Sequence, residues 1–442
     1  MNNVIMRRGF RVITIIFLIF IISNACYSSS QDDSQDQFID EKINNLKDLI
    51  PHPLISITSD DDFISHGFPG NGSITEPYRI ENLNITFSEA GIGIYITNTT
   101  KHCVIQNNYL DTFEDSIYVN NVAPFTIVIQ DNIILFSSSY GVKLKNSEGV
   151  AVSQNIIAYN YLACIYLYNC SYSVIIHNYS IGHILILGSV LISVGSSDFV
   201  EIYNNTCVSS QGDGILLYFS KNAFVVNNTC IDSHQNGIWL KQVCDNSLIA
   251  NNTVSGSFRG LDVWESSHLE IVNNTCVENK WGINIFRIDN SIVKLNKLER
   301  NSKNGLSLGT GAYHNEVFYN KIKKNILHGV HASEKSDNNL IYLNNFINNN
   351  VGGKSQGFDD GTRNIWYLEG LKEGNYWSDL EKRGPYDIDG ISDSQDRYPL
   401  KELIDLKNPT ESKGFMFIVV ILSLAFSSIA IVSRKKFLIK EK

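Results

Sequence analysis

The sequence predicts an all-β solenoid, a parallel β-helix of about 12 rungs, followed by one transmembrane helix. Three observations predict it: an asparagine recurs about every 24 residues, short apolar strands alternate with period two, and helical periodicity is absent between the two ends. A unit of about 24 residues cannot bury its apolar face alone, so successive units must stack as rungs. Rungs about 4.8 Å apart would make a rod of about 55 to 60 Å.

The recurring asparagine forms one column of twelve residues with a mean step of 23.7 residues. The column consists of Asn84, Asn108, Asn132, Asn155, Asn178, Asn205, Asn228, Asn252, Asn274, Asn296, Asn320 and Asn345. In stacked rungs, side-chain amides of equivalent turns hydrogen-bond to one another and to the turn backbone. Asparagine also tolerates the left-handed conformation that such turns need. The column therefore predicts a structural ladder rather than a catalytic row.

Two residues after these asparagines runs a second column that we expect to point into the core. It consists of Leu110, Ile134, Ile157, Ser180, Cys207, Cys230, Val254, Cys276, Leu298, Ile322 and Ile347. A cysteine here is most simply a small core hydrophobe. The alternative is a disulfide between Cys207 and Cys230, because neighbouring rungs about 4.8 Å apart fall within the Cα spacing of such a bond. Without Cys26 seven cysteines remain, an odd number, so a complete disulfide framework is not expected.

Two apolar segments near the ends of the chain predict secretion and anchoring. The eleven-residue run 12–22 follows three arginines and precedes small residues, which is typical of a signal peptide over 1–25. A lipid on Cys26 is the alternative anchor. The segment 414–432 has nineteen uncharged residues, enough to span a bilayer, and the basic residues after it place the tail in the cytoplasm. The parts between are a polar linker (26–54), an N-terminal cap (55–83), the repeats (84–357), a closing segment (358–404), a second linker (405–413) and, after the membrane helix, the tail (433–442).

Composition and charge limit the partners. The chain has 442 residues, of which 43% are apolar and 18% charged, so it can bury a large core and is not disordered. Its formal charge is −9, but eight cations and one acid lie at the two extremities, and the middle alone has a net charge of −16. A surface that acidic repels phosphate backbones, so we do not expect a nucleic-acid partner.

Two segments carry a resemblance to a known family. The N-terminal ISITSDDDF and GFPGNGSITEPYRIENLNIT, and the closing GFDDGTRNIWYLEGLKEGNYWSDL followed by DIDGISD, resemble the NosD-like right-handed parallel β-helix proteins of archaeal surfaces, also described as a carbohydrate-binding and sugar-hydrolase repeat domain. The closing motif matches at Asp360, Gly361, Asn364, Trp366, Gly374, Asn375, Trp377 and Asp379. The resemblance implies a right-handed coil and a carbohydrate ligand. The same scaffold also carries lyases, hydrolases, adhesins and non-catalytic binders, so the fold does not choose between them.

One branch of that family is linked to copper-site maturation, which calls for Met and His ligands. The three Met residues lie at positions 1, 6 and 416, outside the repeats. The one close pair of histidines, His328 and His331, is expected on opposite faces of a strand. We therefore do not expect a copper site.

On the strand that follows each Gly-led turn, alternate side chains should face outward. One outward column is Tyr95, Tyr118, Lys143, Tyr166, Leu191, Leu216, Trp239, Asp262, Asn284, Ser307 and His331, and a second contains Tyr168, Tyr218, Trp264 and Phe286. Exposed aromatics along a flat β face suit stacking on sugar rings, or contact with a protein partner. The alternative is that a flanking loop covers them. The predicted ligand-binding residues are Trp239, Trp264, Asp262, Tyr166, Tyr168, Tyr218 and Phe286.

Charged residues meet this aromatic column near Asp262. Glycoside hydrolysis needs two carboxylates, and a lyase needs a base, often with metal-bound carboxylates. The candidates are Arg259, Asp262 and Glu265, without a sharp catalytic motif. The leading hypothesis is therefore a membrane-anchored surface protein that binds a polysaccharide or surface glycan without cleaving it. A polysaccharide lyase or glycoside hydrolase is the alternative, and a passive surface-coat component is the second.

The C-terminal acidic turn and the sequons complete the predictions. Asp387, Asp389 and Asp393 alternate about a glycine as in calcium loops, so a structural calcium is one interpretation and a plain Asp-rich turn the other; no further cofactor is expected. Nine N-x-S/T sequons are typical of a surface glycoprotein. They lie at Asn71, Asn84, Asn98, Asn169, Asn178, Asn204, Asn227, Asn251 and Asn273.

Overall fold

The computed structural model describes residues 39, 41–42, 49–87, 90–182, 188–381 and 384–406. The chain divides into two compact units, 1–48 and 49–442. In the first unit, the three described residues, Ile39, Glu41 and Lys42, are helical. The predicted signal peptide, Cys26 and the predicted membrane segment 414–432 lie outside the described residues. No helix within the described ranges is long and apolar enough to cross a membrane.

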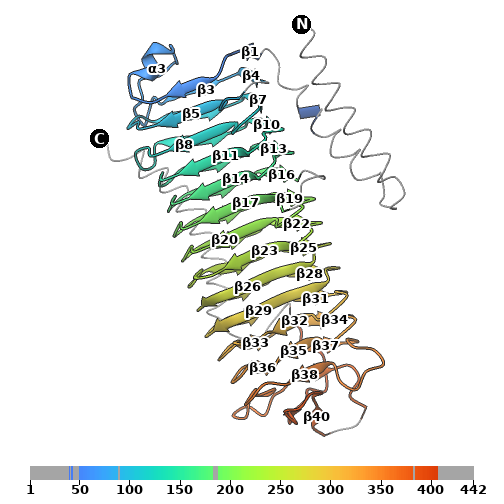
Figure 1. Ribbon diagram of the computed structural model, residues 1–442. Coiled ribbons are helices and arrows are strands. Elements are labelled where there is room, and N and C mark those ends of the chain that lie inside the picture. Colours follow the sequence, from blue (N-terminus) through green and yellow to red (C-terminus); the bar gives the residue numbers. More distant parts are fainter. Residues whose placement is uncertain are drawn as a thin grey trace, which may run out of the picture. The chain divides into compact units, whose positions relative to one another are not determined.

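The second unit winds repeatedly through three parallel sheets, which we name A, B and C (Figure 1). Sheet A has 14 strands, sheet B has 13 and sheet C has 12, and each coil visits them in that order. The predicted parallel β-helix of about 12 rungs is thereby confirmed. Because each coil contains one strand of each sheet, a strand from β1 to β35 pairs with the strand three elements later in sequence.

The strands are short and nearly equal in length. Sheet A contains β1 (Ile50–Pro51), β4 (Leu83–Phe87), β7 (Tyr109–Thr112), β10 (Ile133–Leu135), β13 (Ile156–Ala158), β16 (Tyr179–Ile181), β19 (Thr206–Val208), β22 (Thr229–Ile231), β25 (Thr253–Ser255), β28 (Thr275–Val277), β31 (Lys297–Glu299), β34 (Lys321–Lys323), β37 (Asn345–Ile347) and β39 (Tyr376–Trp377). Sheet C contains β3 (Tyr78–Glu81), β6 (Cys103–Gln106), β9 (Ile127–Gln130), β12 (Ala151–Ser153), β15 (Val174–Ile176), β18 (Glu201–Tyr203), β21 (Phe224–Val226), β24 (Leu248–Ala250), β27 (Glu270–Val272), β30 (Ile292–Lys294), β33 (Glu316–Phe318) and β36 (Leu340–Tyr342).

Sheet B differs because two of its central strands are much longer than the rest. It contains β2 (Ile55–Ile57), β5 (Ile94–Thr97), β8 (Ile117–Asn120), β11 (Tyr140–Lys145), β14 (Ala163–Tyr168), β17 (Val190–Gly195), β20 (Ile215–Tyr218), β23 (Asn236–Lys241), β26 (Arg259–Ser267), β29 (Trp281–Asp289), β32 (Leu306–Leu308), β35 (Val330–Ala332) and β38 (Gly357–Asp359). The nine-residue β26 and β29 pair over seven positions, and both continue past a bend at Glu265 (φ 51°) and Arg287 (φ 52°). Two further strands, β40 (Tyr386–Asp387) and β41 (Gln395–Asp396), form an antiparallel pair, and the short helix α3 (Asp62–Ser65) lies in the first coil.

The inward column of sheet A is confirmed except at its last position. From Leu110 to Ile322 its members are aligned on successive strands and are fully buried. Ile322 aligns with Phe346, so the predicted Ile347 is one residue out of register. The seven described cysteines are free thiols, and Cys207 and Cys230 lie on neighbouring strands without a disulfide. These cysteines are core hydrophobes.

The predicted asparagine ladder exists and joins the turns from sheet C to sheet A. Asn228 is typical: its Nδ2 donates to the Oδ1 of Asn252 (3.1 Å) and to the backbone oxygen of Ile202 (2.8 Å), while its Oδ1 accepts from the Nδ2 of Asn205 (3.0 Å). The predicted terminal members are wrong. Asn84 aligns with Tyr109 instead of Asn108, and the ladder continues from Asn320 through Asn344, not Asn345, to Asn375.

Each ladder asparagine from Asn108 to Asn344 follows a residue with positive φ, such as Asn204, Asn227, Asn251 and Asn273, whose φ values lie between 54° and 57°. In the Asn-Asn pairs 204–205, 227–228, 251–252 and 273–274, therefore, the first asparagine turns the backbone and the second forms the ladder, whereas in the pair 344–345 the first forms the ladder. The ladder asparagines are buried, so the sequon at Asn178, which is one of them, cannot accept a glycan in the folded protein. A second ladder, through Asn301, Asn325 and Asn349, joins the turns from sheet A to sheet B and was not predicted.

The closing segment forms a polar and aromatic seal at the C-terminal end of the coils. Asp359 accepts hydrogen bonds from Nδ2 of Asn364 (2.8 Å) and Nε1 of Trp366 (3.0 Å). Asp396 accepts from Nε1 of Trp377 (2.8 Å), and that ring stacks on Phe346 at 4.1 Å. Several residues of the closing motif thus hold the C-terminal end of the coils together.

Candidate functional site

The outward face of sheet B, here called the sheet B face, carries most of the predicted ligand-binding residues. Its first column runs through Tyr95, Tyr118, Lys143, Tyr166, Ser193, Leu216, Trp239, Asp262, Asn284, Ser307, His331 and Phe358. Ser193 occupies the position predicted for Leu191, which is buried instead. The sequence-based alignment placed this strand two residues too early, because the rung has an unusually long connection before it.

Three aromatic rings meet at the centre of this face, where β23, β26 and β29 lie side by side. The rings of Trp239 and Trp264 approach edge to face, with centroids 5.4 Å apart, and Trp264 lies 5.6 Å from Phe286. All three side chains are half-buried. Among the residues that the structure describes, no segment covers the three rings completely, and their accessible parts can meet a ligand.

Asp262 lies beneath these rings and is almost fully buried. Its Oδ1 accepts hydrogen bonds from Nε1 of Trp264 (2.8 Å) and Nδ2 of Asn284 (2.6 Å). Its Oδ2 has no hydrogen-bond partner, although Nη1 of Arg259 lies 3.6 Å away. Burial raises the pKa of Asp262, against the opposing effects of Asn284, Arg259 and Trp264. The carboxylate therefore anchors Trp264, Asn284 and Arg259 beneath the rings.

Sequence reasoning missed Asp213, which is also buried on this side of the coil. Its Oδ1 accepts hydrogen bonds from the Nδ2 (2.8 Å) and backbone nitrogen (3.0 Å) of Asn236. Burial raises its pKa to about 6, and the nearby charge of Asp262 contributes. The sequence does contain a signal for this position, the residue before the glycine that recurs at the start of these strands: Asp213, Asn236 and Arg259 precede Gly214, Gly237 and Gly260.

The charged residues around the rings separate into two groups. Lys241 places Nζ 4.8 Å from the centroid of the Trp239 ring, and Arg259 forms the ion pair with Asp262. Glu265 instead pairs with Arg287 at 2.7 Å in a more exposed position. Asp262 and Glu265, the predicted carboxylate candidates, therefore contact different arginines and do not form a shared site.

The predicted tyrosines form a second aromatic group nearer the N-terminus. Tyr168 is exposed, and Tyr166 lies 4.8 Å from Tyr140. Tyr218 extends over Gly195, where a Cβ atom would lie 2.1 Å from its ring. Burial and a hydrogen bond with Tyr166 raise the pKa of Tyr218. These tyrosines are thus packed against one another, with Tyr168 the most accessible.

Two family descriptions match the sequence. Residues 201–382 match the family described as "Periplasmic copper-binding protein (NosD)", and residues 70–229 match "Right handed beta helix region". These matches, which together run over residues 70–382, make this part of the chain NosD-like and a right-handed parallel β-helix. The family and handedness predicted from the closing motif are therefore confirmed. Among curated proteins no relative matches the sequence.

Solved structures share the NosD-like coil at low sequence identity. A mannuronic acid specific polysaccharide family 6 lyase from human gut microbiota is 13% identical, with a TM-score of 0.50 over 75% of this chain and 87% of that chain. The A-module of the Azotobacter vinelandii mannuronan C-5 epimerase AlgE6 is 11% identical, with a TM-score of 0.44 over 71% and 79%. The Dettilon tailspike protein is 13% identical, with a TM-score of 0.40 over 76% and 65%. Likeness at these identities concerns the fold alone.

The description of the matched family names copper, for which His, Cys and Met are the usual protein ligands. The prediction for the histidine pair is wrong: His328 and His331 lie on the same side, with ring centroids 5.9 Å apart, because the chain bends at Gly329 between them. Burial lowers the pKa of His328 to about 4, and His331 stacks on Phe358 at 4.6 Å. The described ranges contain no group of three His, Cys, Asp or Glu residues that could hold a metal ion. Two imidazoles without a third donor do not fit a copper centre.

The predicted calcium ligands are likewise dispersed. Asp387 accepts a hydrogen bond from Nε2 of Gln395 (2.7 Å), and Asp389 pairs through its backbone with Phe358. Asp393 has a φ of 48°, which indicates a turn. Within the part of the chain that the structure describes, these carboxylates do not converge as a metal-binding group. Calcium binding stays a prediction.

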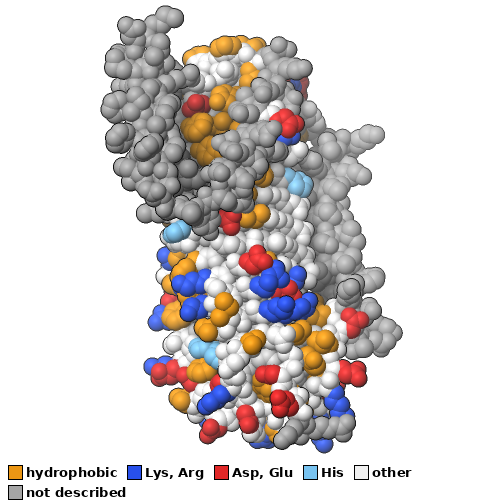
Figure 2. Space-filling model, turned by 90° about the vertical axis from the view of Figure 1, so that its right-hand side faces the viewer, with side chains coloured by type: hydrophobic (Ala, Val, Ile, Leu, Met, Phe, Trp, Pro, Cys, Tyr) orange, Lys and Arg blue, Asp and Glu red, His pale blue; other side chains and the backbone are white. Residues whose placement is uncertain are grey.

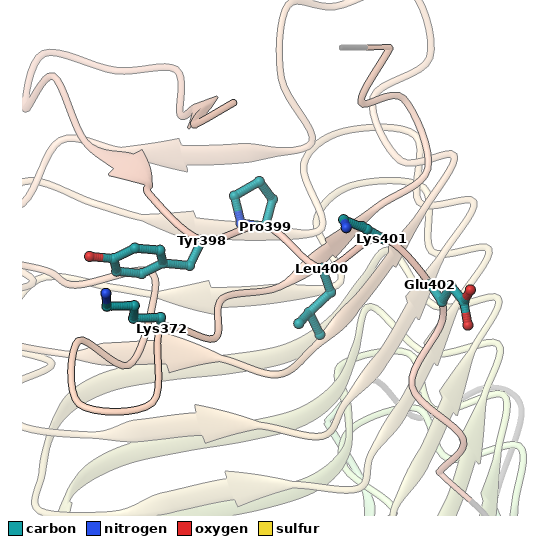
Figure 3. Close-up of a pocket in the computed structure, with 6 residues that line it drawn as sticks. All are labelled: Lys372, Tyr398, Pro399, Leu400, Lys401 and Glu402. Atoms are coloured by element: carbon teal, nitrogen blue, oxygen red, sulfur yellow. The ribbon is translucent and has the colours of Figure 1, made fainter. Parts of the chain in front are cut away.

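A shallow surface depression lies in the closing region (Figure 3). It is lined by Lys372, Tyr398, Pro399, Leu400, Lys401 and Glu402. The Tyr398 hydroxyl donates to Oε1 of Glu369 (3.0 Å), and no predicted site residue lines the depression. The candidate site is therefore the sheet B face.

Proposed function

We propose that this NosD-like protein binds a carbohydrate chain on the sheet B face, outside the cell and without cleaving it. The observation that carries the proposal is the group of three half-buried rings, Trp239, Trp264 and Phe286, above the buried Asp262. Sugar rings present apolar C–H faces that stack on aromatic rings, while their hydroxyls need polar partners. The group provides both within three rungs.

Each residue has a distinct role in this proposal. Trp239 and Phe286 supply the stacking surface, and Trp264 is fixed by its hydrogen bond to Asp262 (2.8 Å). Asp262 is buried beneath the rings and fixes Trp264 from below, and Asn284 orients its carboxylate through the bond to Oδ1 (2.6 Å). Because Asp262 is held from two sides, binding requires little rearrangement of the site.

The cellular placement in the proposal comes from the sequence. The signal peptide 1–25 exports the coil, and 414–432 anchors it with the basic tail inside. Exposed sequons such as Asn204, Asn227 and Asn273 fit a glycosylated surface protein. A surface location, as in the archaeal relatives that the motifs resemble, supplies glycans as ligands.

A second candidate function is cleavage of the bound polysaccharide. The specific observation in its favour is that burial raises the pKa of two carboxylates on the same side of the coil, Asp213 and Asp262. Carboxylates with raised pKa values serve as proton donors in sugar hydrolysis and as bases in lyases. Binding ranks first because the aromatic group is accessible, whereas the two carboxylates are almost fully buried.

The test is binding of the detergent-solubilised full chain to a panel of polysaccharides, with Trp239→Ala as the central variant. Loss of the ring face should weaken binding by about 1 to 2 kcal/mol, roughly five- to thirtyfold. The control is Tyr95→Ala, six strands from Trp239 in sheet B and about 29 Å away at about 4.8 Å per rung. For a short oligosaccharide it should change little.

Three other outcomes decide between the functions. Equal losses at Trp239 and Tyr95 for a short ligand would refute a local platform. New reducing or unsaturated ends in the incubated polysaccharides would establish cleavage and replace the non-catalytic proposal. A panel without any binding would favour the passive surface-coat component.

A further inference from the structure

Cations are concentrated in one part of this acidic chain. Between residues 241 and 324 there are eleven Lys and Arg against eight Asp and Glu, an excess of three cations, although the middle of the chain as a whole has a net charge of −16. A local field of sign opposite to the rest of the surface attracts ligands of the opposite charge. The positions of these cations in the coil therefore indicate what kind of partner they suit.

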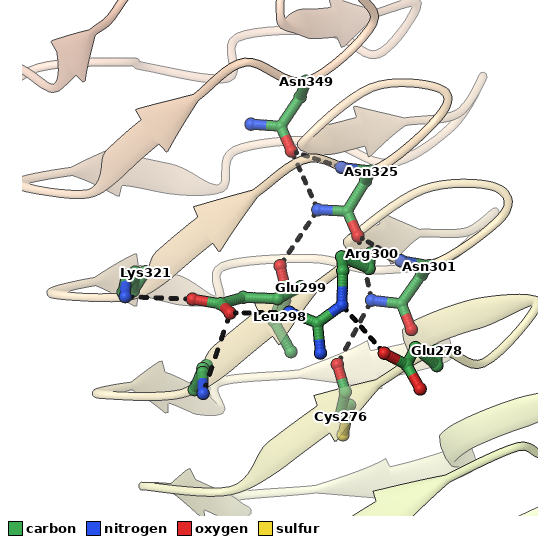
Figure 4. A network of polar contacts seen from close by, with 10 residues as sticks. Cys276, Glu278, Leu298, Glu299, Arg300, Asn301, Lys321, Asn325 and Asn349 are labelled. Carbon is green, nitrogen blue, oxygen red and sulfur yellow. Dashed lines mark hydrogen bonds and ion pairs between the residues drawn. The ribbon is translucent and has the colours of Figure 1, made fainter.

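Three of them contact one buried carboxylate on sheet A (Figure 4). The side chain of Glu299 is 6% exposed, and its carboxylate lies 3.0 Å from Nζ of Lys321, 3.7 Å from Nζ of Lys297 and 3.4 Å from Nη1 of Arg300. Burial opposes ionisation, but Lys321, Lys297 and Lys323 lower the pKa of Glu299, so the carboxylate is ionised. Glu299 thus holds these cations in a fixed group.

The cations keep most of their capacity for an outside partner. The side chains of Lys321, Lys297 and Arg300 are 40%, 46% and 49% exposed. Each ammonium has three donors and each guanidinium five, more than Glu299 and the exposed Glu278, which pairs with Arg300 at 2.8 Å, can accept. Figure 2 shows Lys and Arg side chains gathered on the face that it presents.

The group continues around the turn from sheet A to sheet B. In that turn, Nζ of Lys280 lies 4.9 Å from the ring centroid of Trp281, and the guanidinium of Arg259 lies 5.4 Å from the same ring. Trp281 is the first residue of β29, the strand that carries Phe286 on the sheet B face. We call the five residues Lys280, Lys297, Arg300, Lys321 and Lys323 the basic corner. It adjoins the proposed stacking surface through Trp281.

We propose that the basic corner binds the anionic groups, carboxylate or sulfate, of an acidic polysaccharide whose sugar rings lie on the sheet B face. This inference rests on the proposed function and specifies the class of ligand. The aromatic surface next to the corner favours a sugar polymer, and the acidic remainder of the rod disfavours an extended phosphate backbone.

The experiment uses the full chain and two matched pairs of probes. Oligogalacturonate and its methyl ester differ only in carboxylate charge, and dextran sulfate and dextran differ in sulfate. The test variants are Lys280→Gln, which leaves the Glu299 group intact, and the double variant Lys297→Gln/Lys321→Gln. The control is Lys335→Gln, an exposed lysine in the turn after β35, between sheets B and C. Melting temperatures identify variants that lose their fold.

We expect at least one charged probe to bind at least tenfold more tightly than its neutral counterpart, with affinity falling as salt rises. Both test variants should weaken binding of the charged probe at least fivefold, and the control variant should leave this binding unchanged. Trp239→Ala should weaken the charged probe as well. The pair that shows the preference distinguishes carboxylate from sulfate.

The remaining outcomes overturn one proposal or the other. Equal, Trp239-dependent binding of charged and neutral probes overturns the basic corner and leaves the proposed function standing. Charge-dependent binding that Trp239→Ala does not change overturns the stacking site. Charge-dependent binding that the corner variants do not change, or binding of none of the four probes, overturns the corner.

Discussion

Replacing Asp213 by asparagine should stabilise the protein at neutral pH. The side chain is 3% exposed, and burial raises its pKa from 3.8 to about 6 despite the two hydrogen bonds that it accepts from Asn236. At about 1.4 kcal/mol per pKa unit, keeping this carboxylate ionised at pH 7 costs about 3 kcal/mol. An asparagine oxygen can accept the same two bonds without a charge. We expect Asp213→Asn to raise the free energy of unfolding by about 1 to 3 kcal/mol.

The gain should depend on pH with a defined sign. Because the pKa is higher in the folded state, the folded protein binds more protons than the unfolded chain between about pH 4 and pH 6, so this residue's contribution to stability falls as pH rises through that window. The effect of Asp213→Asn should therefore be full above pH 6 and disappear below pH 4.

Urea unfolding at pH 4 and pH 7.5, with stability obtained by linear extrapolation, measures the difference. The control is Asp61→Asn, the same chemical change at an exposed aspartate. A variant that is destabilised at pH 7.5, or that gains equally at both values, would refute the reasoning. A residue that costs stability at neutral pH is a candidate for function, so the same variant should be included in the binding panel.

Two further predictions concern the ladder and the anchor. Asn228→Ala removes a buried amide that hydrogen-bonds to both neighbouring rungs and should lower the free energy of unfolding by about 1 to 3 kcal/mol. The control Asn84→Ala lies outside the ladder and should lower it by less than about 0.5 kcal/mol. Equal melting temperatures of the two variants would contradict the observed register. Deletion of residues 414–442 should release the protein into the medium, measured by immunoblot of cells and supernatant, and retention on washed cells would point to a lipid on Cys26 or a tight partner.

The repeat made most of the fold predictable. Ten of the twelve predicted ladder positions and all but the last of the inward column are correct, because one period is repeated many times and a single error of alignment becomes visible against its neighbours. The predictions for Asn345 and Ile347 are wrong because the repeat ends there. Asn344 and Asn345 are both compatible with the sequence pattern, and the hydrogen bond of Asn344 to Asn375 in the closing segment selects the register that begins at Asn344.

The candidate site was only partly predictable. Trp239, Asp262 and Trp264 were placed on one face correctly, since period two determines the direction of a strand side chain. Their contacts were not: the approach of Asp262 to Trp264, Asn284 and Arg259 depends on rotamers and on the neighbouring rungs. The histidine pair was misplaced because a bend at a glycine interrupts the alternation that the argument assumed.

By itself, the sequence determined the stacked coil, its number of rungs, the columns that face inward and outward, and the family, because each of these follows from a local pattern repeated along the chain. Only the tertiary structure decided which outward residues meet. Asp213 became a buried acid through Asn236 on the next rung, and Glu299 became the centre of a cationic group through Lys321, 22 residues away. Burial and charge at those two sites depend on residues of neighbouring rungs. The pattern along a single strand does not show which residues of the next rung will be in contact.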